Sequence, residues 1–344
     1  MQPKPSLEST LTRAWLRRGP LACALWPLSL LFRALAALRA ALYRAGVFKS
    51  ERLPVPVIVV GNIFIGGTGK TPLTIWLAEA LRAAGFHPGV ISRGHGGAGS
   101  APRPVGPDSD ARQVGDEPLL IAQRAQCPVM VGRERAAAGR ALLALHPEVD
   151  VVIADDGLQH YALGRDIEII LFDARGAGNG WLLPAGPLRE PVSRRRDFTV
   201  VNAPALTPQL AGAVRGEPFR MRLEGRWAEP LARRGERVAL EALAGKRIVA
   251  AAGIGNPGRF FAMLRAAGLA FAELPLPDHH DFLDQPFAQV DADIILITEK
   301  DAVKCGQIEN LKNDPRLWVV PVTARLDGAL AEQIVEKCRG CSTA

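Results

Sequence analysis

The stretch VIVVGNIFIGGTGKTP, residues 57–72, decides the fold of this chain. It opens within an apolar, mostly β-branched run that begins at Val55, and such a run predicts a strand buried on both faces of a parallel sheet. Glycines follow, and residues 70–85 then have helical spacing and end in glycine, a frequent residue after a helix. A strand, a glycine loop and a helix in this order predict a phosphate-binding loop.

The loop departs from the usual G-x-x-x-x-G-K-[ST] pattern, because Phe64 stands where the first glycine is expected. Backbone N–H groups at the amino end of the helix would surround phosphate, Lys70 would reach the β- and γ-phosphates, and the Thr71 hydroxyl would bind Mg²⁺. The alternative is a glycine-rich turn that contains GKT by chance. We predict a nucleotide site whose contacting residues here are Phe64, Ile65, Gly66, Gly67, Thr68, Gly69, Lys70 and Thr71.

A second stretch, VDVVIADDGLQH at residues 149–160, supports this prediction. It is an apolar strand that ends in Asp155 and Asp156, and carboxylates at such a place hold Mg²⁺ directly or through water. Two acids in the turn after a core strand are the alternative, which the upstream loop disfavours. Gln159 follows closely enough to contact the nucleotide phosphates or a water molecule bound to Mg²⁺.

Further strand-like runs alternate with helical stretches through residue 201. This alternation predicts an α/β fold of the P-loop NTPase type, a mostly parallel sheet flanked by helices, whose ligands bind at the carboxyl ends of the strands. The chain of 344 residues is long enough for two domains. We expect an arm at residues 1–48, the P-loop domain at 49–215 and a smaller α/β domain at 216–344.

The charge lies almost entirely in the arm. Residues 1–50 hold eight Lys or Arg side chains and one acid, Glu8, so their net charge of +7 equals that of the whole chain. A nucleic-acid-binding protein more often carries such charge on its folded domain. The apolar run at 21–32 is short for a bilayer span, so we expect an amphipathic helix on an anionic membrane surface. A cleaved signal peptide and a core helix are the alternatives.

Five scattered cysteines do not form a disulfide framework, which favours a reducing compartment. Cys338 and Cys341 form a CxxC pair that lacks a second ligand pair, so we expect no metal there.

Eight ordered segments between residues 61 and 304 carry a family resemblance. They are GNIFIGGTGKTP, SRGHGG, VGDEPLLIA, ADDGLQH, LLPAGPLREP, GIGNPGRF, LPDHHDF and ITEKDAVK. Together they resemble the tetraacyldisaccharide 4′-kinases, the lipid A 4′-kinases of Gram-negative bacteria, over residues 15–325. In that family a small hydroxyl residue is usual at the position of Phe64 and a tyrosine is common at that of His95, so this chain departs at both.

The resemblance implies ATP-dependent, Mg²⁺-assisted phosphoryl transfer to the 4′-hydroxyl of a membrane-embedded tetraacyldisaccharide 1-phosphate, which gives lipid IVA. It implies a location on the cytoplasmic face of the inner membrane. No nucleic acid and no obligate protein partner are expected. The anionic lipid substrate would also explain why the arm is basic and amphipathic.

The proton of the acceptor hydroxyl needs a positioned base. GDEP places Asp116 and Glu117 at a helix start, where acids are commonly simple caps. The resemblance instead implies that Asp116 is the base, that Glu117 lies near Mg²⁺, and that His279, rather than His280, pairs with Asp116. Arg189 suits a bidentate phosphate contact.

Two motifs stay open at this point. Residues 194–196 are three arginines, which either form a solvated turn or attract anionic lipid. The segment TEKD at 298–301 is assigned no role. A membrane-cycling ATPase would carry a lysine where Ile65 stands, and a GTP-binding switch would carry Asn-Lys-x-Asp, which is absent. A need for a lipid acceptor in ATP turnover separates the kinase from the cycling ATPase.

Overall fold

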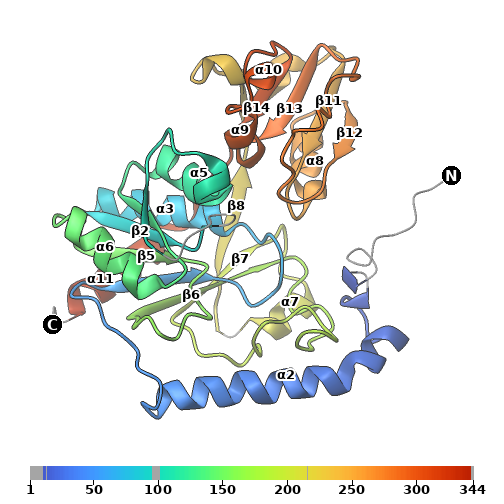
Figure 1. Cartoon of the computed structure of the whole chain (residues 1–344). Helices are drawn as coiled ribbons and strands as arrows, with labels where there is room; N and C mark the ends of the chain where they lie inside the picture. Colours follow the sequence, from blue (N-terminus) through green and yellow to red (C-terminus); the bar gives the residue numbers. More distant parts are fainter. Residues whose placement is uncertain (1–10, 13, 95–100, 215, 342–344) are drawn as a thin grey trace.

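The computed structural model describes residues 11–12, 14–94, 101–214 and 216–341. Within them the chain forms a sheet of nine strands, a sheet of six strands and a long helix near the amino end that runs beneath the first sheet in Figure 1. His95 and the end of the SRGHGG segment lie outside the described residues, as do Glu8 and two of the arm's basic residues.

The first sheet is mostly parallel, as the sequence predicted. Neighbouring strands from β8 to β4 are parallel, and antiparallel strands β15 and β3 close the two edges. In spatial order the strands are β15 (Thr323–Leu326), β8 (Phe219–Glu224), β7 (Phe198–Asn202), β6 (Ile167–Asp173), β1 (Val57–Gly61), β5 (Val151–Asp155), β2 (Pro88–Ser92), β4 (Val129–Val131) and β3 (Arg103–Val105).

Both faces of this sheet are buried, which explains the continuous apolar run in β1. Successive side chains of a strand point to opposite faces, so Ile58 and Val60 enter one core and Val57 and Val59 the other. The first core is completed by α3 (Lys70–Ala83), α4 (Ala111–Val114), α5 (Asp116–Ala125) and α11 (Gly328–Gly340). The second is completed by α6 (Arg135–Leu145) and α7 (Pro208–Ala213).

Strand register brings the glycine-rich phosphate loop after β1 close to the acidic pair at the end of β5. Val60 of β1 pairs with Asp155 of β5, and Ile91 of β2 pairs with Ala154. The carboxyl ends of three parallel strands therefore meet at one level of the sheet edge. The phosphate loop leaves β1 at this level, as expected for a ligand site in an open α/β sheet.

Residues 227–320 supply every strand of the second sheet, and we call them the second-sheet unit. Its strands in spatial order are β10 (Val238–Ala239), β9 (Trp227–Pro230), β14 (Leu317–Val320), β13 (Ile294–Thr298), β11 (Ile248–Ala252) and β12 (Ala272–Pro275). The helical elements are η1 (Leu231–Arg233), η2 (Leu240–Leu243), α8 (Pro257–Ala266), α9 (Glu299–Cys305) and α10 (Glu309–Lys312). Helix α8 packs on one face and α9 with α10 on the other.

The sheets divide the chain less simply than the expected boundary at residue 215. Strand β8 follows that residue yet pairs with β7, and β15 returns from beyond the second-sheet unit to pair with β8. Helix α11 then packs into the core of the first sheet. The division into 49–215 and 216–344 stays a prediction. Strand pairing places β8 and β15 with the first sheet, and core packing places α11 there.

Helix α2 (Pro20–Arg44) is the arm, and it contacts the protein along a narrow line. Ser29 is buried and its hydroxyl donates to the Leu182 carbonyl at 2.8 Å. The helix is long and apolar enough to cross a membrane, with a mean hydropathy of 1.8 over a stretch that is 11% buried. It is therefore not a core helix. The large apolar side chains that it exposes are Leu21, Trp26, Leu28, Leu30, Leu31, Leu35 and Leu38.

Candidate active site

The phosphate loop needs glycine at two positions, and Phe64 is not one of them. Gly66 and Gly69 have φ angles of 96° and 103°, a region that favours glycine, whereas Phe64 lies outside it. The buried Phe64 ring packs under the Arg175 guanidinium, whose carbon is 4.2 Å from the ring centroid. The same guanidinium donates to the Gly67 carbonyl at 3.3 Å. Phe64 thus anchors an arginine that braces the loop.

Lys70 begins α3 and points back toward the loop. Its Nζ donates to Asn62 Oδ1 at 3.2 Å and lies 3.7 Å from Asp156 Oδ1. Asn62 in turn donates to the carbonyls of Phe64 and Gly66 at 2.6 and 3.1 Å. Sequence reasoning missed Asn62, whose only signal was its place directly after the strand. It ties the shape of the loop to the position of the lysine.

Asp155 is buried at the carboxyl end of β5. Its two oxygens accept from the Thr74 hydroxyl at 3.2 Å and the Ser92 hydroxyl at 3.3 Å. Burial, together with the nearby charges of Glu117 and Asp156, raises the pKa of Asp155 to about 7, although Lys70 and the Thr74 hydrogen bond act against this rise. The carboxylates therefore repel one another in a poorly solvated place.

Asp156 is held by two cations. Its φ of 49° turns the carboxylate toward Arg189, whose Nη1 lies 3.2 Å from both oxygens. Burial alone would raise the pKa of Asp156, but Lys70 and Arg189 outweigh burial and hold that pKa below its usual value. Gln159 donates to Glu190 Oε1 at 2.9 Å, so in this structure the amide faces a neighbouring carboxylate.

The oxygen ligands predicted for a metal fit a hard divalent cation. Thr71 follows Lys70 in α3 and is half-buried. Asp155 ends β5, and Asp156 is the residue that follows this strand. The mutual repulsion that raises the pKa of Asp155 would fall if a divalent cation lay among these carboxylates. Hydroxyl and carboxylate oxygens are the ligands that Mg²⁺ takes. The set Thr71, Glu117, Asp155 and Asp156 could therefore hold Mg²⁺.

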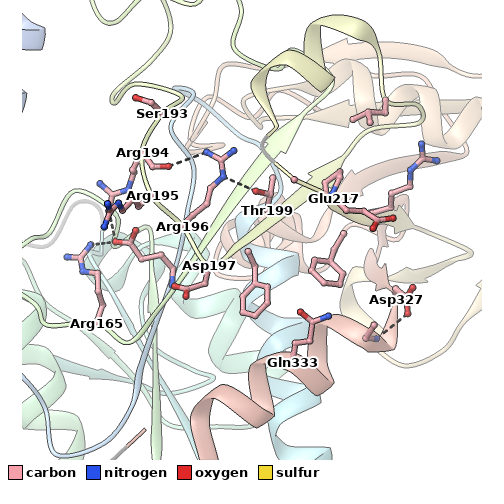
Figure 2. Close-up of a pocket in the computed structure, with 18 of the residues that line it drawn as sticks. Arg165, Ser193, Arg194, Arg195, Arg196, Asp197, Thr199, Glu217, Asp327 and Gln333 are labelled. Atoms are coloured by element: carbon pink, nitrogen blue, oxygen red, sulfur yellow. Dashed lines mark hydrogen bonds and ion pairs between the residues drawn. The ribbon is translucent and has the colours of Figure 1, made fainter. Parts of the chain in front are cut away.

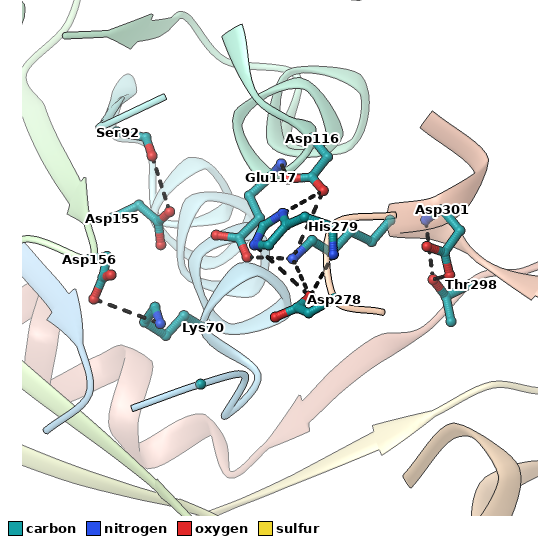
Figure 3. A network of polar contacts seen from close by, with 12 residues as sticks. Lys70, Ser92, Asp116, Glu117, Asp155, Asp156, Asp278, His279, Thr298 and Asp301 are labelled. Atoms are coloured by element: carbon teal, nitrogen blue, oxygen red, sulfur yellow. Dashed lines mark hydrogen bonds and ion pairs between the residues drawn. The ribbon is translucent and has the colours of Figure 1, made fainter. Parts of the chain in front are cut away.

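Asp116 and His279 meet across the two sheets. Helix α5 begins at Asp116 after Gly115, whose φ is 94°, and Asp116 Oδ1 accepts from the Glu117 N–H at 2.9 Å. His279 follows β12, has a φ of 58°, and places Nδ1 3.0 Å from Asp116 Oδ2 (Figure 3). This hydrogen bond raises the pKa of His279, which burial and Lys300 would lower.

His280 faces its own loop instead. Its Nδ1 accepts from the Phe282 N–H at 3.1 Å, and its Nε2 lies 3.4 Å from Asp284 Oδ2. Of the two adjacent histidines, the structure therefore brings His279, and not His280, to Asp116.

Two lysines of α9 complete the surroundings of these acids, and neither was assigned a role from the sequence. Lys300 Nζ lies 3.0 Å from Glu117 Oε1, 3.7 Å from Asp278 Oδ1 and 4.0 Å from Asp116 Oδ2. Lys304 Nζ lies 3.3 Å from Asp116 Oδ2. Burial alone would raise the pKa of Asp116, but His279 and both lysines hold it well below its usual value. A spacing of four residues on one helix was the available signal.

The other polar residues of TEKD build the helix that carries these lysines. The Thr298 hydroxyl accepts from the Asp301 N–H at 3.2 Å and caps α9. The Asp301 carboxylate accepts from that hydroxyl at 2.7 Å and from the Gly253 N–H at 3.0 Å. The acid therefore ties α9 to the GIGNPG loop, and nothing in its geometry resembles base recognition.

That GIGNPG loop lies against the phosphate loop. A Cβ atom on Gly255 would lie 3.0 Å from the Gly67 nitrogen and 3.1 Å from Asp278 Oδ2, so a side chain here would crowd both groups. Nearby, Arg259 Nη1 donates to the Thr68 carbonyl at 3.3 Å. The second-sheet unit thus touches the phosphate loop directly.

Arg135 is a buried cation that sequence reasoning missed. It begins α6, is 2% exposed, and donates to the Gly132 carbonyl at 2.7 Å. Its charge acts on Asp155 and Asp156, and burial lowers its own pKa to about 10. It lends positive charge to the acidic pair from a place that water does not reach.

The described residues line one hollow beside this site and another distant from it. A hollow of about 350 Å³ borders Asp116, His279 and Lys304. A wider one, of about 1440 Å³, lies at the amino ends of β6 and β7, the opposite sheet edge from the phosphate loop (Figure 2).

The arginine run lines the wider hollow, and two of its members are engaged within the protein. Arg194 forms ion pairs with Glu168 and Glu190, and Arg196 Nε donates to the Thr199 hydroxyl at 2.8 Å. Arg195 is exposed. The run is therefore largely a structural element at this edge.

The C-terminal CxxC pair does not form part of a metal cluster in the portion of the chain that the structure describes. Cys338 lies in α11 and is buried in the first core, and burial raises the pKa of its thiol to about 12. Among the described residues, the group that could hold a metal ion consists of His280, Asp281 and Asp284, away from these cysteines. The two aspartates of this group are exposed.

Comparison with known proteins places this geometry in a family. The sequence model described as tetraacyldisaccharide-1-P 4′-kinase matches residues 21–339. Relatives named tetraacyldisaccharide 4′-kinase include one from Janthinobacterium sp. (strain Marseille), 65% identical over 99% of both chains. Another, from Herminiimonas arsenicoxydans, is 63% identical over 99% of this chain and 98% of its own.

A solved structure agrees in fold. The "apo" form of LpxK from Aquifex aeolicus, in complex with ATP, superposes with a TM-score of 0.74 and 30% identity. The match covers 92% of this chain and 99% of that one. The expected fold class is thereby confirmed, and the chain belongs to the tetraacyldisaccharide-1-P 4′-kinase family.

Proposed function

We propose that this protein transfers the γ-phosphate of ATP to the 4′-hydroxyl of tetraacyldisaccharide 1-phosphate, the lipid A precursor, and so forms lipid IVA. The observation that carries the proposal is the Asp116–His279 contact at 3.0 Å, made beside a phosphate loop whose Lys70 faces the same cluster (Figure 3). Family membership supplies the acceptor, and the solved relative that holds ATP supports the donor.

Each residue has a distinct task in this proposal. Lys70 neutralises charge on the transferring phosphoryl group, and the loop residues 64–71 hold the nucleotide through their backbone N–H groups. Asp116 takes the proton of the 4′-hydroxyl. His279 donates to Asp116 and fixes its orientation. Arg189, which contacts Asp156, would bind nucleotide phosphates. Gln159 would do so after leaving its hydrogen bond with Glu190.

When bound, Mg²⁺ would neutralise charge on the β- and γ-phosphates. Thr71, Asp155 and Asp156 would hold it, with Glu117 close by. In this structure Lys300 forms an ion pair with Glu117, so the Glu117 carboxylate has a cationic partner without a metal.

Membrane association is proposed through α2. Its exposed leucines form an apolar surface, while Arg33, Arg39 and Arg44 give it positive charge that anionic headgroups attract. We propose that it lies on the cytoplasmic face of the inner membrane, where ATP is available and the lipid substrate can be reached.

We also propose three functional parts: the arm at 1–48, a P-loop part that starts at residue 49, and the second-sheet unit. The last brings His279 to Asp116, so closure of the two sheets would assemble the site.

The test is purified full-length protein in detergent–lipid mixed micelles with ATP, Mg²⁺ and tetraacyldisaccharide 1-phosphate. The expected product is the bisphosphorylated lipid, identified by mass. Lys70→Ala should lower its rate of formation by at least about two orders of magnitude. ATP hydrolysis that proceeds without the lipid and yields no phosphorylated lipid would instead indicate a cycling ATPase.

A further inference from the structure

The segment ITEKDAVK has a place in the structure that the proposed function leaves unused. Helix α9 begins within it and packs against α5 of the first sheet. Residues four apart lie on one face of a helix, and Lys300 and Lys304 both face the amino end of α5. That end of α5 carries Asp116 and Glu117.

We propose that Lys300 and Lys304 are positioning residues for the phosphoryl transfer. They hold the carboxylates of Asp116 and Glu117 in one orientation against the second-sheet unit, so that Asp116 and His279 stay aligned with the acceptor hydroxyl. The inference rests on the proposed function and adds a task for two residues that it does not use.

The geometry leaves the Asp116 carboxylate little freedom. One oxygen, Oδ1, accepts from the Glu117 N–H. The other, Oδ2, has His279 Nδ1 at 3.0 Å, Lys304 Nζ at 3.3 Å and Lys300 Nζ at 4.0 Å. Two lysines of α9 therefore lie beside the oxygen that faces the histidine. Without the lysines, the contact with His279 would be the remaining side-chain restraint on that oxygen among the interactions described.

These contacts are protected from solvent, which makes them stronger than surface ion pairs. The Lys300 and Lys304 side chains are 17% and 14% exposed, and that of Asp116 is 6% exposed. Charge pairs at a comparable distance on an exposed surface contribute little, because water and salt screen them. A partly buried cluster resists rearrangement, since any unpaired charge left there is costly.

A neighbouring ion pair separates positioning from simple attachment. Arg124 of α5 donates to Glu299 of α9, so it joins the same two helices one residue before Lys300. Neither side chain contacts Asp116 in the described ion pairs. If α9 serves only to attach to α5, then removing the Arg124 side chain and removing a lysine side chain should lower kcat by similar factors.

The experiment compares Lys300→Met, Lys304→Met, Lys300→Arg and Lys304→Arg with Arg124→Met as the matched control. For each, kcat and the KM for ATP are measured at saturating Mg²⁺, with the midpoint of thermal unfolding. We expect each Met variant to lower kcat about 10- to 100-fold, because small misplacements of a reacting group are costly. The KM for ATP should change less than about threefold, since neither lysine contacts the phosphate loop among the ion pairs described. The Arg variants should recover at least about a fifth of wild-type kcat by keeping the charge.

Arg124→Met should lower the unfolding midpoint at least as much as the lysine variants while kcat stays within about twofold of wild type. The inference is overturned if kcat falls equally in Arg124→Met, if the loss of kcat follows the loss of thermal stability, or if Arg does not restore activity.

A second readout does not depend on turnover. The ring signal of His279 in an NMR spectrum of histidine-labelled protein should move in Lys304→Met, return in Lys304→Arg, and stay in place in Arg124→Met. An unmoved signal in Lys304→Met contradicts the inference even if the wild-type protein proves to have another activity. Wild-type protein that forms no phosphorylated lipid, with a His279 signal that moves as expected, counts against the proposed function alone.

Discussion

Two of the contacts that the second-sheet unit makes with helix α5 and the phosphate loop are opposite in character. At one, α9 faces α5 with lysines against carboxylates. At the other, Gly255 lies against Gly67 with no side chain between the two backbones. The first contact holds side chains in place through charge. The second acts through steric exclusion, because atoms added at Gly255 would meet the Gly67 backbone, which makes it the more sensitive gauge of how closely the two parts meet.

The largest effect should follow from breaking the charged contact at its centre. Asp116→Ala removes the proposed base as well as the partner of both lysines, so kcat should fall about 100- to 10,000-fold. ATP affinity, measured by calorimetry, should stay within about threefold, because Asp116 makes no contact with the phosphate loop among the interactions described.

Combining Asp116→Ala with His279→Ala should lower kcat little beyond the worse single variant, since residues that act as a unit are not additive. Strictly multiplicative losses would show that the two residues have separate tasks.

A smaller effect is expected from breaking the glycine contact. Gly255→Val places a branched side chain against the Gly67 backbone and Asp278, so we expect the second-sheet unit to move away. A displacement near 1 Å can cost about 100-fold in rate, and we expect kcat to fall about 10- to 100-fold, with a higher KM for ATP. The control is Gly258→Ala, where the nearest heavy atom to a Cβ would be Asn256 Oδ1 at 3.7 Å. Equal losses in both variants would refute the steric explanation.

Arg259→Ala, a change next to the glycine contact, should lower kcat/KM for ATP much less than Gly255→Val does. Its guanidinium makes one long hydrogen bond, 3.3 Å, to the Thr68 carbonyl next to the glycine contact. A single neutral-acceptor hydrogen bond of this kind is worth about 1 kcal/mol, so kcat/KM for ATP should fall less than about tenfold. A loss as great as that of Gly255→Val would mean that the arginine, and not backbone approach, maintains this contact.

The smallest effect concerns the pH dependence of stability. The pKa of His279 is raised in the folded protein by Asp116. A raised pKa contributes stability that is full below the unfolded pKa of about 6.5 and is lost as pH rises through the folded pKa. Because the ring is 42% exposed, we expect only about 0.5–1 kcal/mol between wild type and His279→Gln in acid, shrinking above neutral pH. Urea unfolding at pH 5.5 and pH 8.5 measures it, and a difference that grows with pH contradicts the assignment.

What the sequence could predict was local or carried by family resemblance. The strand, glycine loop and helix at 57–83 follow from patterns within one segment, and so do the acids that end β5. The pairing of Asp116 with His279 joins residues 163 positions apart, and no local pattern announces it. It was predicted from the resemblance, and the structure brings the two side chains together.

Other features needed the tertiary structure. Lys300 and Lys304 acquire partners only because α9 packs on α5. Strand β15 is a short segment with mixed exposure, and such segments carry little periodic signal. Its return to the first sheet therefore could not be read from residues 323–326 alone.

That return has a mechanical consequence. The chain leaves the first sheet after Glu224 and comes back at Thr323, and these two residues are partners in the β8–β15 register. The second-sheet unit is thus an insertion joined to the first sheet by two short linkers, residues 225–226 and 321–322. The linkers leave the first sheet from the paired residues Glu224 and Thr323. Two adjacent linkers favour rotation of the second-sheet unit about a single hinge axis. The β8–β15 pair, to which both linkers are joined, sets the direction of that axis.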